Sequence, residues 1–234
     1  MLEMLFTRGD GLDALRVVIA VASLAVSVIY LRFVDAPPSA ARTAMKTAGI
    51  ATLTLLPLTY LGVIGAYTGA LVVLAAALAL SALGDFLLAL EDQSRFFVMG
   101  LASFLAAHVA YLIAFLPRAN MPGVVALTVI ITALLAAATF LAVLAPKLGK
   151  LLIPVFAYFA VIMAMVASAL SIAEAPWFLG AGAVIFALSD SLIAQRKFLA
   201  PFPMINEAVW VTYIAAQFML TAGLLALLIP AQVG

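Results

Sequence analysis

Charged residues and metal-binding side chains are scarce in this sequence. Its 234 residues include 11 Lys or Arg, 10 Asp or Glu, one His and no Cys. The absence of Cys excludes disulfides, thiolate nucleophiles and Cys-based metal sites, and a single His excludes a His-rich metal centre. A net charge of +1 gives no basic surface of the kind that binds nucleic acid. The sequence therefore predicts no metal, no other cofactor and no nucleic-acid partner.

Three common catalytic signatures are also missing. The sequence contains no G-x-S-x-G, no H-E-x-x-H and no G-x-x-x-x-G-K-[ST]. A serine lipase, a zinc protease of the H-E-x-x-H type and a P-loop ATPase would each carry one of these motifs. Carboxylate chemistry and transport remain as the functions that the polar residues can support.

Apolar residues, by contrast, are abundant. Hydrophobic residues make up 68% of the chain and charged residues 9%, and the mean hydropathy is +1.31. A soluble domain needs about a quarter of its residues charged to cover its surface. The composition therefore predicts an integral membrane protein. We expect an all-α polytopic fold, a compact bundle that forms a single transmembrane domain over residues 1–234.

Turn residues divide the sequence into about eight apolar runs. Each run is close to the roughly 20 residues that a helix needs to cross the hydrocarbon core, and the breaks, such as residues 35–38 and 118–123, contain Pro, Asp, Asn or Gly. The predicted transmembrane helices are 13–34, 45–64, 67–90, 95–116, 121–145, 150–172, 176–196 and 206–229. The acidic residues Glu3, Asp10 and Asp13 indicate that the first run is a retained helix and not a cleaved signal.

The distribution of Lys and Arg predicts the orientation. Basic residues in the connections after the first, third, fifth and seventh runs are Arg32, Arg42, Lys46, Arg95, Lys147, Lys150, Arg196 and Lys197. Basic residues on the other side are Arg8, Arg16 and Arg118. By the positive-inside rule, both termini are non-cytoplasmic. We expect the protein in the plasma (inner) membrane.

Two aspartates lie inside apolar runs in similar local sequence. Asp85 stands in the block GDFLLAL and Asp190 in the block SDSLIA. A carboxylate at the centre of a membrane helix costs about 2.5 to 3.5 kcal/mol on insertion scales, so it needs a partner or a function. Two such carboxylates in similar local sequence predict a functional site that contains both of them. The alternative is a structural role, in which each accepts interhelical hydrogen bonds or pairs with Lys46.

The spacing around the aspartates fits an internal duplication. His108 and Tyr213 follow Asp85 and Asp190, respectively, by the same number of residues. Lys46 and Lys150 are separated by nearly the interval between the aspartates. These intervals fit two parallel four-helix repeats, related by an axis along the membrane normal. Coincidence among Leu and Ala runs is the alternative.

Helical rise predicts how deep the polar residues lie. At 1.5 Å per residue, both aspartates are about 8 to 9 Å from the cytoplasmic interface. Tyr158, Gln217 and His108 are deeper on the same side, so a polar cavity opening toward the cytoplasm would collect them all. Taken singly, each of these three is equally compatible with packing or interhelical bonding.

Several sequence blocks resemble the YhhN-like lysoplasmalogenase family. They are GDFLLAL at 84–90, F-x-x-x-H-x-x-Y at 104–111, G-A-x-x-F-x-x-S-D-x-x-I-A at 182–194 and Y-x-x-x-Q at 213–217. The resemblance implies a membrane hydrolase that cleaves the vinyl ether bond of lysoplasmalogen, giving a fatty aldehyde and glycerophosphoethanolamine or glycerophosphocholine. It implies catalytic roles for Asp85 and Asp190. The implied pocket residues are Lys46, His108, Tyr111, Tyr158, Ser189, Tyr213 and Gln217.

The chemistry of such a reaction matches an aspartate pair. Protonation of the vinyl carbon gives an oxocarbenium ion, water adds to it, and the hemiacetal collapses to an aldehyde and an alcohol. The reaction needs one carboxylic acid and one carboxylate, and two neighbouring buried carboxyls do not both ionise. The pair therefore supplies an acid and a base. Which aspartate is the acid stays open, because coupled groups titrate together.

A proton-coupled transporter of a small molecule or lipid is the main alternative. Intramembrane aspartates, a lone His and parallel repeats also occur in proton relays. A transporter needs polar groups reaching both faces, whereas the candidate residues cluster toward the cytoplasmic half. A purely structural role is the third alternative, and it predicts that replacing either aspartate by Asn abolishes folding. The hydrolase interpretation implies a lysophospholipid substrate and contact with membrane lipid.

Overall fold

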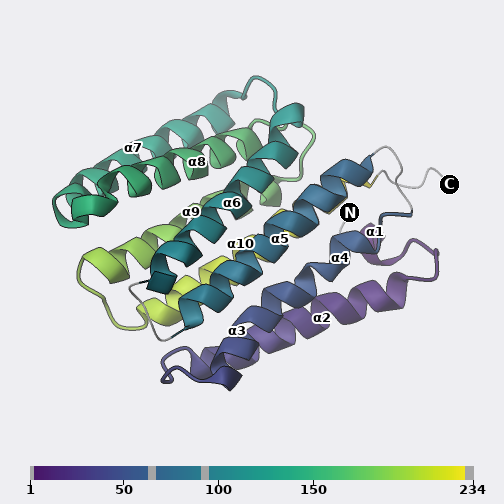
Figure 1. Ribbon diagram of the computed structural model, residues 1–234. Coiled ribbons are helices and arrows are strands. Elements are labelled where there is room, and N and C mark those ends of the chain that lie inside the picture. Colours follow the sequence, from purple (N-terminus) through teal and green to yellow (C-terminus); the bar gives the residue numbers. More distant parts are fainter. Residues whose placement is uncertain (1–2, 63–66, 91–94, 230–234) are drawn as a thin grey trace.

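The computed structural model describes residues 3–62, 67–90 and 95–229, and every regular element in these ranges is helical. The α-helices are α1 (Glu3–Phe6), α2 (Asp13–Tyr30), α3 (Ala40–Leu53), α4 (Leu55–Leu58), α5 (Thr68–Ala89), α6 (Arg95–Phe115), α7 (Val124–Leu148), α8 (Leu152–Leu170), α9 (Trp177–Phe198) and α10 (Ile205–Leu228). Figure 1 shows the long helices side by side with roughly aligned axes. The predicted all-α membrane bundle is confirmed.

Six segments of the described residues are long and apolar enough to cross a membrane. They are Asp13–Phe33, Thr68–Ala89, Arg95–Arg118, Val124–Leu170, Trp177–Phe198 and Ile205–Leu228. The longest of them holds both α7 and α8, which fold back against each other (Figure 1). Helices α3 and α4 are each too short to be counted alone. The number of eight membrane crossings therefore stays a prediction.

The second predicted helix, 45–64, differs most from the structure. Helix α3 begins earlier, at Ala40, where the side chain of Ser39 accepts a hydrogen bond from the backbone N–H of Arg42 and caps the helix. The helix is interrupted at Thr54, and the short α4 follows. Pro57 has no N–H to donate to the carbonyl of Leu53, which explains the interruption. Residues 63–66, which include the predicted end of this helix, lie outside the described residues.

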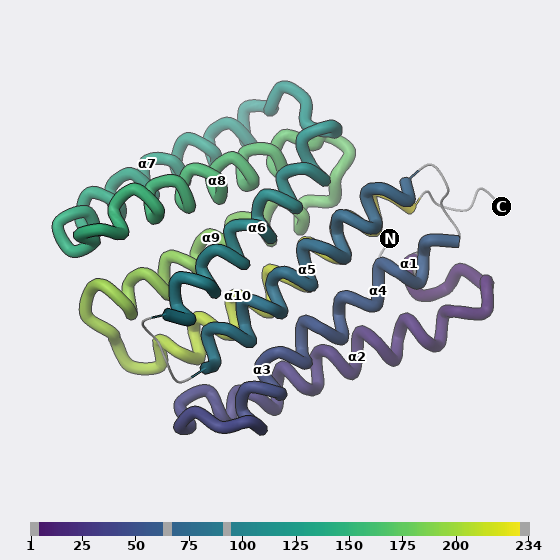
Figure 2. Tube along the Cα trace, in the orientation of Figure 1, coloured from purple at the N-terminus to yellow at the C-terminus, as the bar shows by residue number. Residues whose placement is uncertain are grey.

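Four helices form the middle of the bundle. Helix α5 packs along α6 and α9 along α10, with α2 and α3 on one side and α7 and α8 on the other (Figures 1 and 2). Small residues allow close approach: a Cβ added at Gly84 would lie 2.6 Å from the ring of Phe104, and one at Gly182 would lie 2.9 Å from Cβ of Met219. Gly84 precedes Asp85, so tight packing of α5 on α6 fixes the position of that aspartate.

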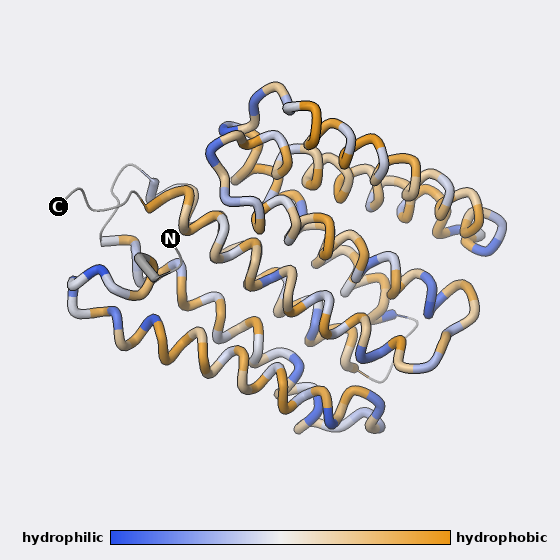
Figure 3. Tube along the Cα trace, turned by 180° about the vertical axis from the view of Figure 1, so that it is seen from behind, coloured by the Kyte–Doolittle hydropathy of each residue, from blue (hydrophilic) through white to orange (hydrophobic). Residues whose placement is uncertain are grey.

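The outer helices expose apolar side chains. Val18 and Val21 on α2 and Leu135 on α7 are among the exposed large hydrophobic residues. Hydrophobic residues colour most of the helix lengths in Figure 3, while the most hydrophilic residues gather toward the helix ends. A surface of this kind is stable in lipid and not in water, which agrees with the membrane assignment.

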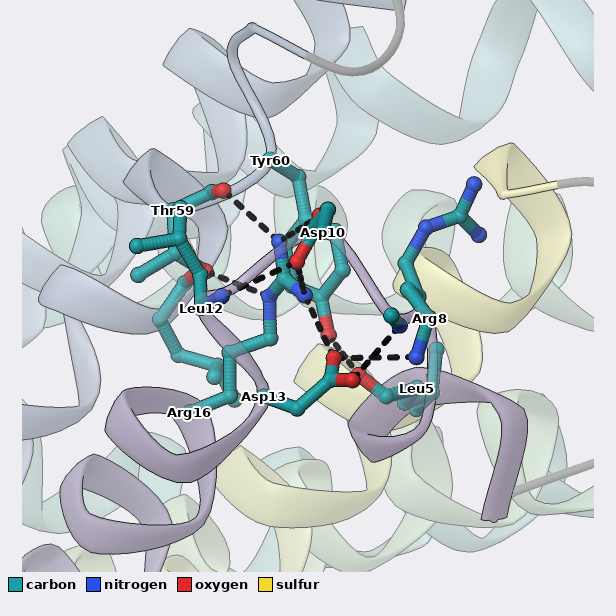
Figure 4. Close-up of polar contacts among 10 residues, drawn as sticks. Leu5, Arg8, Asp10, Leu12, Asp13, Arg16, Thr59 and Tyr60 are labelled. Carbon is teal, nitrogen blue, oxygen red and sulfur yellow. Dashed lines mark hydrogen bonds and ion pairs between the residues drawn. The ribbon is translucent and has the colours of Figure 1, made fainter.

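Arg16, a buried arginine, links the N-terminal segment to the helix bundle through hydrogen bonds (Figure 4). The guanidinium of Arg16 donates to both carboxylate oxygens of Asp10 and to Oδ1 of Asp13. It also donates to the hydroxyl and the carbonyl of Thr59, and it lies 4.1 Å from the ring centroid of Tyr60. All five N–H donors of the guanidinium are therefore used.

Candidate active site

Asp85 lies on α5 between a hydroxyl group and a cation. Its side chain is buried, and its Oδ2 accepts a hydrogen bond of 2.7 Å from the hydroxyl of Tyr213 on α10. The Nζ of Lys46 on α3 lies 3.7 Å from Oδ1 of Asp85. A hydrogen-bond donor and a positive charge both favour the ionised carboxylate.

Asp190 lies on α9 in different surroundings. Its Oδ2 accepts a hydrogen bond of 2.6 Å from the hydroxyl of Tyr158 on α8. The Nε2 of His108 on α6 lies 3.5 Å from the same oxygen, which is long for a hydrogen bond. Within the part of the chain that the structure describes, Asp190 has no ion pair with Lys or Arg.

The contacts of His108 bear on the protonation of Asp190. The Nδ1 of His108 is 2.6 Å from the carbonyl oxygen of Phe104, so Nδ1 carries a hydrogen and donates it. In a neutral ring, Nε2 is then an acceptor, and it faces a carboxyl oxygen. Two acceptors that face each other repel. Nε2 of His108 has no hydrogen-bond partner, so this approach favours a proton on Asp190 or on Nε2 over two bare acceptors, whereas Asp85 is paired with Lys46.

The two aspartates take partners from opposite halves of the sequence. Tyr213 from the second half binds Asp85 in the first, and His108 from the first half faces Asp190 in the second. Residues at equal spacing from their aspartates thus make reciprocal contacts, which supports the predicted duplication. Lys150 does not take part, because it is exposed.

Tyr111 and Gln217 form a second, deeper interaction. The hydroxyl of Tyr111 donates to Oε1 of Gln217 over 2.6 Å, and both side chains are fully buried. This bond ties α6 to α10 next to the helix turns that carry His108 and Tyr213. The Nε2 of Gln217 has no hydrogen-bond partner. The two residues therefore support the site through the helices that carry it, and they hold no contact with either carboxylate.

Ser189 lies apart from the cavities beside the aspartates. Its hydroxyl donates to the carbonyl of Val209 on α10 over 3.0 Å, and the side chain is buried. It lines neither of the two cavities that Asp190 borders. The observed contact is a link between α9 and α10.

Two adjoining cavities meet at Asp190. A polar cavity of about 50 Å³ is lined by Asp85, Lys46 and Tyr213, among others, and by Asp190. An apolar cavity of about 30 Å³ is lined by Tyr158, by Asp190 and by aromatic and aliphatic side chains such as Phe97, Leu101 and Phe198. Asp190, Leu88, Phe104 and Ile193 border both cavities. A bound molecule with a polar part and an apolar chain could place their junction at Asp190.

The polar cavity also borders residues that the sequence did not single out for it. Arg42 and Arg196 line it, as do Tyr30 and Trp210. Arg42 lies close to the start of α3 and Arg196 close to the end of α9, which puts the cavity near one end of the bundle. Positive charge at a helix end is typical of a membrane anchor, so sequence alone gave no signal that these arginines face the aspartates.

Metal ligands are not gathered at this site. Among residues 3–62, 67–90 and 95–229, no group of three His, Cys, Asp or Glu side chains comes together. The chemistry available to the described residues is that of two carboxyls, an imidazole, phenols and three cations.

Comparisons with known proteins identify relatives of this chain. The model of the YhhN family matches residues 41–224, a range that holds all the candidate site residues. A Mycobacterium tuberculosis (strain CDC 1551 / Oshkosh) protein named lysoplasmalogenase is 38% identical over 151 residues, which cover 63% of this chain and 58% of the relative. The human protein named lysoplasmalogenase TMEM86B is 33% identical over 168 residues, which cover 71% of this chain and 68% of the relative. The chain thus spans less than two thirds of the mycobacterial relative. No solved structure matches it.

Proposed function

The chain belongs to the YhhN family, and on that premise we propose that it is a membrane hydrolase that cleaves the vinyl ether bond of lysoplasmalogen. The products are a fatty aldehyde and glycerophosphoethanolamine or glycerophosphocholine. Relatives named lysoplasmalogenase support the reaction. The observation that carries the proposal is the junction of a polar and an apolar cavity at Asp190, with a second carboxylate, Asp85, beside it in the polar cavity.

Asp190 is the general acid in this proposal. It has no Lys or Arg partner among the described residues, and Nε2 of His108, which faces it at 3.5 Å without a hydrogen bond, favours a protonated carboxyl. A protonated Asp190 donates its proton to the vinyl carbon that is not bonded to oxygen. The electron pair of the double bond forms the new C–H bond, and the neighbouring carbon becomes an oxocarbenium ion. His108 positions this proton and can return one to Asp190 after turnover.

Asp85 is the ionised partner. Lys46 and Tyr213 favour its negative charge, which stabilises the oxocarbenium ion. Asp85 then accepts a proton from the water that adds to the cation. As the hemiacetal collapses, its C–O bond to glycerol breaks, Asp85 gives the proton it took from water to the glycerol oxygen, and the hydroxyl proton of the hemiacetal passes to the Asp190 carboxylate, directly or through His108. The sum is one water consumed, one aldehyde and one alcohol formed, and both carboxyls returned to their starting states.

Substrate binding follows from the two cavities. The apolar cavity takes the alkenyl chain and the polar cavity takes the glycerol end, so the substrate is a lysophospholipid drawn from membrane lipid. At about 30 and 50 Å³, each cavity has room for only a few water-sized groups, far less than a lipid chain or a glycerophosphate. The helices around them therefore separate when the substrate enters.

The proposed setting is the plasma (inner) membrane, with both termini on the non-cytoplasmic side and the whole chain forming one transmembrane domain. The Lys and Arg distribution supports this orientation. Three of the basic residues that the positive-inside rule assigns to the cytoplasmic side line the polar cavity, namely Arg42, Lys46 and Arg196. We therefore propose that the polar cavity lies on the cytoplasmic side of the membrane.

Aldehyde release from lysoplasmenylethanolamine tests the proposal. Purified wild-type protein in detergent should release aldehyde, while Asp85→Asn and Asp190→Asn should fold with an unchanged gel-filtration profile and release at least about 100-fold less. Ser191→Ala is the matched control, because Ser191 neighbours Asp190 but bonds only to the carbonyl of Ala187. No release by folded wild-type protein would contradict the hydrolase and favour the proton-coupled transporter, which proteoliposome flux would then detect.

A further inference from the structure

Three cationic side chains border the polar cavity. Lys46 is paired with Asp85, whereas Arg42 and Arg196 have no ion pair among the described residues. Arg42 donates from Nε to the carbonyl of Phe33 and from Nη2 to the carbonyl of Val34, both over 3.2 Å. These bonds hold its guanidinium in place without neutralising it.

Arg196 is also held without being neutralised. Its Nη1 donates to the side-chain oxygen of Asn206, and the nitrogen of Asn206 donates to Oδ1 of Asp35 over 2.6 Å. The side-chain amide of Asn206 thus lies between Arg196 and the carboxylate of Asp35. A direct contact with Asp35 would satisfy the charge of Arg196, but the arrangement leaves the arginine available to another anion.

The charges around the cavity do not balance. With Asp190 protonated, as the proposed mechanism requires, the cations Arg42, Lys46 and Arg196 face Asp85 in the cavity lining, and Asp35 behind Asn206 adds a second negative charge, so one positive charge stays in excess. The three cations lie within electrostatic reach of one another. Repulsion between like charges is poorly screened where apolar walls limit solvent. An anion in the cavity would relieve this repulsion, and a phosphate group matches the donor fork of arginine.

We propose that Arg42 and Arg196 bind the phosphate of the substrate while Lys46 stays paired with Asp85, so that the enzyme selects phosphate-bearing 1-alkenyl glycerols over phosphate-free ones. This inference rests on the proposed function. The order of groups along a lysophospholipid is phosphate, glycerol, vinyl ether and chain. In the site, the cations line the polar cavity, and Asp190 borders both this cavity and the apolar cavity. Phosphate bound at the arginines would therefore bring the vinyl ether to Asp190.

Lys197 provides a matched control on the same helix end. It follows Arg196 in the sequence, but its Nζ lies over the ring of Phe97 at 4.7 Å from the centroid, and it does not line the polar cavity. If the basic residues serve only to anchor α9 at the membrane surface, replacing Lys197 and replacing Arg196 should have the same effect on the kinetics. If Arg196 binds phosphate, only its replacement should weaken binding of the phospholipid substrate.

Kinetics on two substrates test the proposal. Arg42→Gln and Arg196→Gln should each raise KM for lysoplasmenylethanolamine about 10- to 100-fold, as loss of a charged hydrogen bond predicts, with little change in kcat. Lys197→Gln should match the wild type. On a 1-alkenylglycerol of equal chain length, all four proteins should give the same KM. An equal loss on both substrates, or an effect of Lys197→Gln as large as that of Arg196→Gln, would overturn the proposal.

Inorganic phosphate distinguishes a lipid phosphate from a free anion. The proposal predicts that millimolar phosphate does not lower the rate at a lipid concentration equal to KM, because the lipid phosphate is held together with its chain. Inhibition of the wild type by micromolar phosphate, lost in Arg196→Gln, would assign the cations to a free anion and overturn the proposal.

A binding assay separates this inference from the proposed reaction. Trp210 lines the polar cavity, whereas the other Trp, Trp177, is exposed at the start of α9. In a Trp177→Phe background, an uncleavable 1-alkyl lysophosphoethanolamine should change the fluorescence of Trp210, and 1-alkylglycerol should bind at least about tenfold more weakly. That difference should disappear in Arg196→Gln. This result would stand even if the wild type cleaved neither substrate, and equal binding of both lipids would refute phosphate recognition.

Discussion

Replacing Arg16 should destabilise the protein without touching the site. The guanidinium is fully buried and its five donors bind Asp10, Asp13 and Thr59 (Figure 4). Arg16→Met keeps most of the side-chain volume and removes all five bonds. Asp10, on the connection before α2, and Thr59, after α4, then lose the link that joins them.

The expected loss of stability in Arg16→Met depends on how buried the arginine and its two carboxylate partners are. Removing one partner of a buried pair costs about 3 to 5 kcal/mol. The carboxylates of Asp10 and Asp13 keep 25% and 27% of their exposure, so water can replace part of what they lose. We therefore expect a loss of about 2 to 3 kcal/mol. For a chain of this size, that lowers the unfolding temperature by about 5 to 10 °C.

Thermal unfolding in detergent checks this value. Arg32→Met is the control, because Arg32 is exposed just after α2 and has no ion pair in the described part of the chain. Aldehyde release at low temperature should be equal in both variants. Equal unfolding temperatures for Arg16→Met and Arg32→Met would refute the reasoning, since the buried bonds would then contribute nothing beyond what water supplies.

The same cluster predicts a pH dependence of stability. The hydrogen bond from Arg16 lowers the pKa of Asp10 below its ordinary value of 3.8. A carboxyl whose pKa is lower in the folded state contributes stability above its unfolded pKa, and that contribution is lost as the pH falls through the folded pKa. The unfolding temperature of the wild type should therefore fall below about pH 4 more steeply than that of Arg16→Met.

Three further predictions concern the site and the orientation. Lys46→Met should lower kcat at least about tenfold because Asp85 loses its cation, and an unchanged kcat for aldehyde release would contradict that role. Tyr158→Phe should lower kcat/KM about tenfold by removing one hydrogen bond to the carboxyl it contacts, whereas equal kinetics would exclude it from the reaction. Because the chain has no Cys, single cysteines report orientation: an impermeant maleimide on intact cells should label Met121→Cys and not Lys150→Cys, and the reverse result would invert the proposed topology.

The sequence singled out several residues that the structure brings together. A carboxylate in an apolar helix is costly, so Asp85 and Asp190 stood out from composition alone, and equal spacing directed attention to His108 and Tyr213. The structure brings each of these two residues to an aspartate. Of the residues that the predicted polar cavity was expected to collect, Asp85 and Asp190 line it, whereas Tyr158, Gln217 and His108 do not. Lys46 and Tyr213 line it as well.

Other features depend on which helix faces which, and a sequence pattern does not contain that information. Ser189 adjoins Asp190 in the sequence, but successive helical residues point about 100° apart, and its hydroxyl turns to α10. Arg42 and Arg196 have the positions of surface anchors, and the structure places both of them in the lining of the cavity. Arg16 lies near the start of the first predicted helix, where a charge is expected at the membrane surface, and it is buried because Asp10 and Thr59 bind its guanidinium.

Hydrolysis in deuterated water tests the central claim most directly. If Asp190 protonates the vinyl carbon, the aldehyde formed by the wild type, reduced at once to the alcohol to stop exchange, should carry one deuterium on the carbon next to the former carbonyl. The folded Asp190→Asn variant should form no such product. Aldehyde without deuterium at that carbon, or full deuterium incorporation by Asp190→Asn, would contradict proton transfer from this aspartate.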